Sequence, residues 1–240
     1  MILLFTDFGW DGPYVGQMKA RLLALGVGPV VDLMHDAPAF DPRASAYLLR
    51  ALVGQQSSPA HWLAVVDPGV GGARRAVALA ADGHWWVGPD NGLFALLVRA
   101  AEQAQAFELP VPESAAPTFH GRDVFAPATA RLAQSGPGDW PAIDPRTLDR
   151  PAWPDDWPAV IYVDAFGNAM TGLRADRVPD NARIRVGECL LTRARTFSDR
   201  APGEAFWYAN SLGLVELAVN RGSAAERLGL RPGTAVEVLS

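Results

Sequence analysis

The sequence predicts an α/β protein with two domains: an N-terminal α/β domain with a mostly parallel sheet, and a small C-terminal β-barrel domain. Strand-like apolar runs alternate with helical patterns in the first half of the chain, which is typical of parallel βαβ units. A stretch rich in Pro and Trp follows, and then short, regularly spaced apolar runs that are typical of a barrel or sandwich. We therefore expect the α/β domain at residues 1–136, a linker at 137–158 and the barrel at 159–240.

The first expected element is an apolar run at residues 2–5, a strand that ends in the turn Thr6-Asp7-Phe8-Gly9. Two short apolar runs on either side of Asp82-Gly83 predict a β-hairpin. Apolar residues spaced by three and four predict helices. The other elements expected in this domain are strands at residues 30–33 and 63–66 and helices at residues 14–25, 41–53, 91–101 and 123–134.

Residues 136–158 contain six prolines, so we expect little regular structure there. The region that follows is predicted to be mostly β, with one helical turn at residues 223–228. Its expected strands are residues 160–164, 183–186, 190–197, 205–209, 214–219 and 235–239.

Composition narrows the class of protein. A hydrophobic content of 49% with 20% charged residues is ordinary for a globular protein, and a net charge of −5 argues against a nucleic-acid partner. The single cysteine, Cys189, excludes an intramolecular disulfide and a cysteine zinc cluster. We see no secretory signal and no apolar run of about 20 residues that would span a membrane, so we expect a cytoplasmic protein.

The most informative segment is the turn from Asp67 to Arg75, which follows a buried strand and contains three glycines. In open α/β sheets, ligands bind at the carboxyl ends of the strands. The glycines resemble a phosphate-binding loop, but such a loop must open a helix, and a hairpin follows here. The third glycine of that fingerprint is also replaced by Arg74. We therefore reject a phosphate loop and keep Asp67 and Arg74 as site candidates.

A second polar cluster lies around His120, just before a predicted helix with Asp123 in its first turn. His120 is the histidine best placed for chemistry, since His61 and His84 begin strands and His35 lies in a turn. A structural role remains the alternative for each of them. The sequence contains no H-x-x-x-H or H-E-x-x-H metal motif and no G-x-S-x-G elbow.

Six motifs, in order along almost the whole chain, resemble the S-adenosyl-L-methionine (SAM) hydroxide adenosyltransferases, which are relatives of the SAM-dependent fluorinase and chlorinase. Their spacing makes the set far more specific than any one of them. The motifs are Thr6-Asp7-Phe8-Gly9, Val66-Asp67-Pro68-Gly69-Val70-Gly71, Gly88-Pro89-Asp90-Asn91-Gly92, Phe119-His120-Gly121-Arg122-Asp123, Asp164-Ala165-Phe166-Gly167-Asn168 and Asn210-Ser211-Leu212-Gly213.

This resemblance implies a hydrolase in which water attacks C5′ of the SAM ribose and gives adenosine and L-methionine. The family's catalytic set corresponds here to Asp67, Arg74 and His120. The sulfonium is a good leaving group, so the enzyme must mainly orient water and accept its proton. Whether Asp67 or His120 is the base stays open, and Arg75 is the neighbouring alternative to Arg74.

The resemblance also implies a substrate site, a homotrimer with sites at subunit interfaces, and no cofactor, since SAM is the substrate. Asp7 corresponds to the group that binds the ribose hydroxyls, and Phe40 to an aromatic wall beside the ribose. The remaining substrate-binding residues are expected in the second domain, at Asp164 for the ammonium, Phe166, Asn168 and Phe197 for the adenine, Ser211 for the carboxylate, and Glu216 and Val219 along the ligand.

Two other functions stay open at this point. The first is a SAM-dependent halogenase, but the halogenases carry tyrosines where this chain has Asp67 and His120, and a carboxylate repels a halide. The second is a non-enzymatic module that binds adenosine or SAM, for which the catalytic set would be dispensable.

Overall fold

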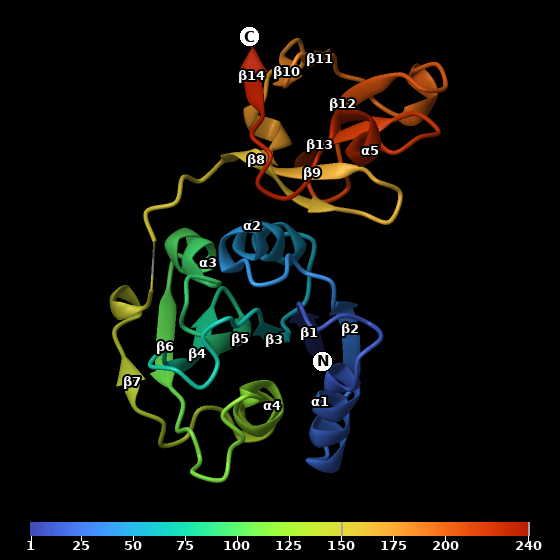
Figure 1. Cartoon of the computed structure of the whole chain (residues 1–240). Coiled ribbons are helices and arrows are strands. Elements are labelled where there is room, and N and C mark those ends of the chain that lie inside the picture. Colours follow the sequence, from blue (N-terminus) through green and yellow to red (C-terminus); the bar gives the residue numbers. More distant parts are fainter. Residues whose placement is uncertain (150, 240) are drawn as a thin grey trace. The chain divides into compact units, whose positions relative to one another are not determined.

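The computed structural model describes residues 1–149 and 151–239 (Figure 1). The chain divides into two compact units. The first comprises Met1–Ala46 and Gln56–Pro151, and the second comprises Tyr47–Gln55 and Ala152–Ser240. Among the described residues, no helix is both long enough and apolar enough to cross a membrane.

The first unit is built on a seven-stranded sheet with the order β2-β1-β3-β5-β4-β6-β7. Strands β1, β2, β3 and β5 pair in parallel, whereas β4 pairs antiparallel with both β5 and β6, and β6 with β7. The expected α/β fold with a mostly parallel sheet is therefore confirmed. The strands are β1 (Ile2–Thr6), β2 (Val30–Met34), β3 (His61–Val65), β4 (Ala76–Ala81), β5 (His84–Pro89), β6 (Ala104–Glu108) and β7 (Ala142–Ile143).

Helices cover both faces of this sheet (Figure 1). Helices α1 (Pro13–Ala24) and α4 (Ala126–Ser135) pack on one face, where Met18 and Leu22 join a fully buried core. Helix α3 (Ala95–Ala100) and the beginning of α2 (Pro42–Val53) lie on the other face. Helix α1 connects β1 to β2 on one side of β1, and α2 then connects β2 to β3 on the other side of β1. The strand order therefore reverses between β1 and β3, which is a topological switch point. The carboxyl ends of β1 and β3 thus form the crevice where α/β sheets bind ligands.

The second unit contains two separate antiparallel sheets, with the orders β12-β13-β9-β8 and β11-β10-β14. The expected β-barrel is not confirmed, because no closed sheet forms among the described residues. One reason lies at residues 190–197, where β11 ends at Leu191 and a short 3-10 helix, Phe197–Asp199, follows. The strands are β8 (Trp157–Val163), β9 (Ala169–Arg174), β10 (Arg183–Val186), β11 (Cys189–Leu191), β12 (Ala205–Ala209), β13 (Leu214–Val219) and β14 (Glu237–Leu239).

Two segments differ from the expected helices in the first unit. The helix expected at residues 91–101 begins only at Ala95, because Gly92 is left-handed (φ 92) and the Asn91 amide donates to the Val66 carbonyl at 2.9 Å. The helix expected at 123–134 is preceded by one π-helical turn, η1 (Gly121–Phe125), which continues directly into α4. In the second unit, the helical turn expected at 223–228 is α5 (Ala224–Leu228).

Candidate active site

Three side chains that are far apart in the sequence meet beyond the end of β3. Asp67 follows β3, Arg74 precedes β4, and His120 caps η1. Arg74 Nε donates to Asp67 Oδ1 at 3.0 Å, and its Nη2 group lies 2.5 Å from Asp67 Oδ2 and 3.0 Å from His120 Nδ1. The side chains of Arg74 and Asp67 are only 9% and 5% exposed, so this is a nearly dry ion pair.

The Arg74 contact fixes the protonation of His120. A guanidinium has no lone pair, so Nδ1 of His120 must accept the hydrogen bond and the ring proton sits on Nε2. Burial lowers the pKa of His120, and the nearby Arg74 charge lowers it further. His120 is therefore neutral at pH 7 and presents an N–H donor on its far side.

The glycine turn makes this meeting possible. Gly71 has a φ of 75°, and a Cβ placed there would lie 2.4 Å from the Pro117 carbonyl oxygen. The turn can therefore press against the segment that carries His120. It leads directly into β4 and not into a helix, consistent with the rejection of a phosphate loop. Arg75 donates to Asp90 Oδ2 at 2.8 Å, so Arg74 is the arginine that contacts Asp67.

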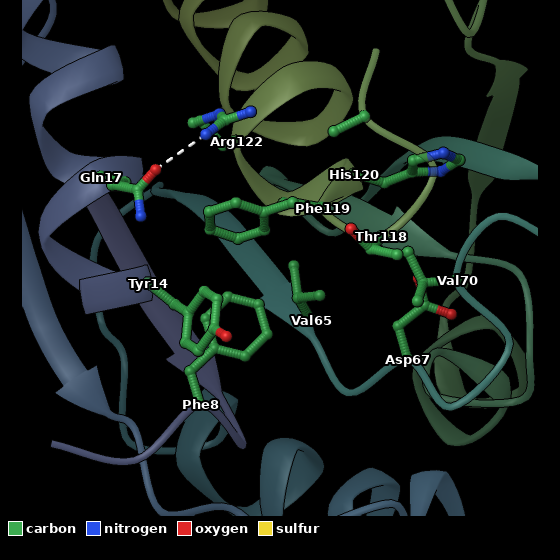
Figure 2. A pocket seen from close by; sticks show the side chains of 12 residues that line it. Phe8, Tyr14, Gln17, Val65, Asp67, Val70, Thr118, Phe119, His120 and Arg122 are labelled. Atoms are coloured by element: carbon green, nitrogen blue, oxygen red, sulfur yellow. Dashed lines mark hydrogen bonds between the residues drawn. The ribbon is translucent and has the colours of Figure 1, made fainter. Parts of the chain in front are cut away.

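Asp67 and His120 line a cavity of about 410 Å³ in the first unit (Figure 2). The opposite wall is aromatic, with the ring centroids of Phe8, Tyr14 and Phe119 5.3 to 6.1 Å apart. Sequence reasoning did not select these three rings as site residues. Phe8 stands in the motif that supplied Asp7, and Phe119 in the motif that supplied His120, so both motifs held the signal.

Asp7 and Phe40 lie together where β1 ends and where α2 is about to begin. The Phe40 backbone N–H donates to Asp7 Oδ2 at 3.0 Å. Phe40 is 78% exposed and left-handed, with a φ of 58°. Burial raises the pKa of Asp7, the Phe40 N–H opposes that rise, and the negative charge of Asp67 adds to it. The two carboxylates therefore interact, and a cation placed near them would be stabilised.

The second unit has its own cavity, of about 630 Å³. Asp164 accepts hydrogen bonds from the Asn168 backbone and side chain at 2.8 and 3.0 Å, which fixes the amide beside it. Tyr208 and Arg221 also line this cavity and were not selected from the sequence. Five residues expected in the substrate site line it, namely Asp164, Phe166, Asn168, Phe197 and Val219.

The other two expected substrate residues lie elsewhere in this unit. Glu216 is buried behind the cavity, where its carboxylate accepts from the Tyr208 hydroxyl and the Asn210 amide, both at 2.6 Å. Burial raises the pKa of Glu216 despite these two donors. Ser211 is exposed in the turn between β12 and β13 and does not line the cavity. Among the residues the structure describes, no cluster of three or more His, Cys, Asp or Glu could hold a metal ion.

Comparison with known proteins identifies the family of this chain. Residues 2–139 match the SAM hydroxide adenosyltransferase N-terminal domain, and residues 158–237 match the C-terminal domain of that family. The chain therefore belongs to the SAM hydroxide adenosyltransferase family.

Several relatives carry a specific name. The (R)-S-adenosyl-L-methionine hydrolase of Thermus thermophilus is 44% identical, with 99% of each chain covered, and that of Salinispora tropica is 41% identical over 97% of this chain and 95% of its own. The fluorinase of Nocardia brasiliensis is 25% identical, over 99% of this chain and 96% of its own. A solved structure of an uncharacterized conserved protein from Thermotoga maritima superposes with a TM-score of 0.89 at 28% identity, covering 100% of both chains.

Proposed function

We propose that this protein is a SAM hydrolase, which uses water to displace methionine from C5′ of the ribose. The products are adenosine and L-methionine. The observation that carries this proposal is that Asp67 and His120 line one cavity and are joined by Arg74, which contacts both. The full-length similarity to named (R)-S-adenosyl-L-methionine hydrolases supports it.

The hydrogen-bond directions suggest how water is activated. The Nε2–H group of His120 donates to the water oxygen, while a carboxylate oxygen of Asp67 accepts a water proton, so one lone pair is aimed along the line of attack. As the O–C5′ bond forms, the C5′–S bond breaks and its electron pair moves to sulfur. The released proton passes to Asp67 and then to solvent. Arg74 holds both partners and has a buried Nη1 group without a hydrogen-bond partner among the described residues, which a bound water can use.

The substrate's charge fits the first unit. Asp7 and Asp67 together favour the sulfonium cation, and the Asp7 carboxylate beside Phe40 accepts from the ribose hydroxyls. Asp67 in particular disfavours a halide as the attacking group, which separates this chain from a halogenase. The chemistry calls for no cofactor, because the sulfonium already makes methionine a good leaving group.

We assign the remaining parts of SAM to the second unit, mostly to its cavity. Phe166 and Phe197 are positioned to stack on adenine, and the side-chain oxygen of Asn168 is free to accept from its amino group. Asp164 takes the methionine ammonium. The exposed Ser211 turn takes the carboxylate, Val219 contributes the apolar wall, and Glu216 supports this wall through Tyr208.

We further propose a cytoplasmic homotrimer in which the two cavities that share one SAM come from neighbouring subunits. Mixing an Asp67→Asn protein with an Asn168→Ala protein, after mild dissociation and reassembly, should restore part of the activity, because some interfaces then carry two intact halves. Light scattering should give a trimer's mass. No recovery in a confirmed mixed assembly would contradict a shared site.

The deciding experiment supplies each sulfonium epimer of SAM in ¹⁸O-labelled water. We expect the (R)-epimer, after which the relatives are named, to react faster and to place the label in the 5′-hydroxyl of adenosine. Asp67→Asn should lower kcat by about 10²- to 10⁴-fold, the usual contribution of a general base. A 5′-chloro product in chloride buffer would indicate a halogenase, and unchanged SAM binding without turnover would indicate a binding module.

A further inference from the structure

A buried histidine that takes no part in the proposed reaction contacts the substrate loops of the first unit, which are the loop after β1 with Asp7 and the loop after β2 with Phe40. His35 follows β2 and is completely buried. Its Nδ1 atom is 2.8 Å from the Thr6 hydroxyl, and its Nε2 atom is 3.1 Å from Asp32 Oδ1. The Lys19 ammonium donates to Asp32 Oδ2 at 2.6 Å.

The hydrogen bonds of this network converge on Asp32, which accepts from Lys19 on one side and faces His35 on the other. Asp32 is held ionised, because the side chains of Lys19 and His35 lower its pKa more than its burial raises it. The carboxylate therefore accepts from Nε2–H of His35, and when the ring carries only that proton, Nδ1 accepts from the hydroxyl of Thr6. The same Thr6 oxygen accepts from the Phe8 backbone N–H at 3.3 Å. A continuous series of hydrogen bonds thus joins Lys19 to the Phe8 backbone.

The end of this series is the loop that carries Asp7. Asp7 lies between Thr6 and Phe8, so both of its neighbours are fixed by one hydroxyl. Backbone bonds join the same two loops, with Gly9 N–H donating to the His35 carbonyl at 2.7 Å and Ala37 N–H to the Thr6 carbonyl at 3.1 Å. His35 is therefore the buried side chain that ties the β1 loop to the loop that carries Phe40.

We propose that His35 is a positioning residue for SAM binding, acting through Thr6 to hold Asp7 where it meets the ribose hydroxyls. This inference rests on the proposed function, because it assumes that Asp7 binds ribose. A carboxylate must be placed within a few tenths of an ångström to accept from two hydroxyls at once. The fixed loop supplies that placement before the substrate arrives.

Two nearly isosteric variants test the link at Thr6. Thr6→Val removes the hydroxyl and should raise KM for SAM by about 2- to 12-fold, the range for one lost hydrogen bond, with a smaller effect on kcat. Thr6→Ser keeps the hydroxyl and should remain close to the wild type. His35→Gln should resemble Thr6→Val.

His84→Gln is the matched control for the histidine variant. His84 also accepts partly buried hydrogen bonds, from Ala60 N–H and the Trp62 indole, but it begins β5 and so lies at the amino ends of the parallel strands, away from the substrate loops. It should lower the melting temperature without changing KM. If His84→Gln raised KM as much as His35→Gln, the effect would reflect general stability and the inference would fall.

A SAM analogue without the 2′- and 3′-hydroxyls separates positioning from structure. With this analogue the KM penalty of Thr6→Val should largely disappear, because Asp7 has nothing left to bind. A penalty of the same size for both substrates would overturn the inference. Asp7→Asn distinguishes a failure of the proposed function from a failure of this inference. If Asp7→Asn leaves KM unchanged, Asp7 does not bind the ribose. If Asp7→Asn raises KM but Thr6→Val does not, only the positioning role of His35 fails.

Discussion

At the scale of single residues, the guanidinium of Arg74 organises the candidate catalytic set. It contacts Asp67 and His120 simultaneously, and its lack of any lone pair decides which histidine nitrogen carries the proton. A lysine here would keep the charge but lose the planar arrangement of donors that reaches both partners. Our proposal of Asp67 as proton acceptor rests on this geometry, whereas the sequence left Asp67 and His120 as alternatives.

The left-handed backbone of Phe40 has an unfavourable conformational free energy at the proposed site. A left-handed conformation costs a residue other than glycine about 1 kcal/mol or more, and the exposed ring contributes little to the core. We expect Phe40→Gly to leave the free energy of unfolding unchanged or raise it by up to about 1 kcal/mol, while KM for SAM rises. Urea unfolding and steady-state kinetics measure the two effects.

Asp82→Gly is the control for this prediction. Asp82 is also left-handed, with a φ of 47°, but lies in the hairpin turn between β4 and β5. It should change stability in the same direction and leave the kinetics unaltered. A normal KM for Phe40→Gly would show that the ring does not contact the substrate.

At the scale of elements, the turn from Asp67 to Arg74 depends on one close backbone approach. Gly71→Ala adds a Cβ that would lie 2.4 Å from the Pro117 carbonyl oxygen. We expect a loss of about 2 to 4 kcal/mol in stability, from the left-handed conformation together with the clash. The catalytic rate should also fall, because the turn must move away from His120.

Gly187→Ala separates these two contributions. Gly187 is left-handed, with a φ of 54°, but no atom lies within 4 Å of the added Cβ. It should cost only about 1 kcal/mol and leave kcat unchanged. If Gly71→Ala and Gly187→Ala lowered the free energy of unfolding equally, the clash with Pro117 would contribute nothing to the loss.

The sequence predicted well those elements whose apolar residues recur without interruption, such as β1, α1, β12 and β13. Strand β9 was missed because Gly172 weakens its pattern, yet a Cβ there would lie 2.9 Å from Trp157. The barrel was expected from strand spacing alone, and spacing does not reveal that β11 stops at Leu191. For the site, the family resemblance grouped Asp67, Arg74 and His120, whereas no pattern distinguishes the cavity ring of Tyr14, which lies outside the six motifs, from a core aromatic.

At the scale of the whole molecule, three histidines make the fold sensitive to acid. Burial lowers the pKa of His61, His84 and His120, and the amino terminus and Arg74 lower those of His61 and His120 further. The folded state therefore binds fewer protons than the unfolded chain below about pH 6.5. The stability is fully present above that pH and is lost as the pH falls through the lowered values.

We therefore expect the melting temperature to fall between about pH 7 and pH 5. Asp7 and Glu216, whose pKa values burial raises, act in the opposite sense as the pH falls through those raised values, and their effect is complete below the ordinary carboxyl pKa of about 4. His84→Gln should flatten the decline, because one of the three protonation costs is removed. A melting temperature that is constant over this range would contradict the assignment.

The reversal of the chain between β1 and β3 has a consequence for how such proteins diversify. Asp7, which we assign to the substrate, belongs to the loop after β1, whereas Asp67 and His120, which we assign to the attacking group, belong to the loop after β3 and to η1. The two tasks therefore reside in separately encoded segments that meet only in space. Substitutions at the second set can exchange one nucleophile for another without disturbing recognition of the nucleoside, so a single scaffold can accommodate both hydrolases and the fluorinases that share a quarter of its sequence.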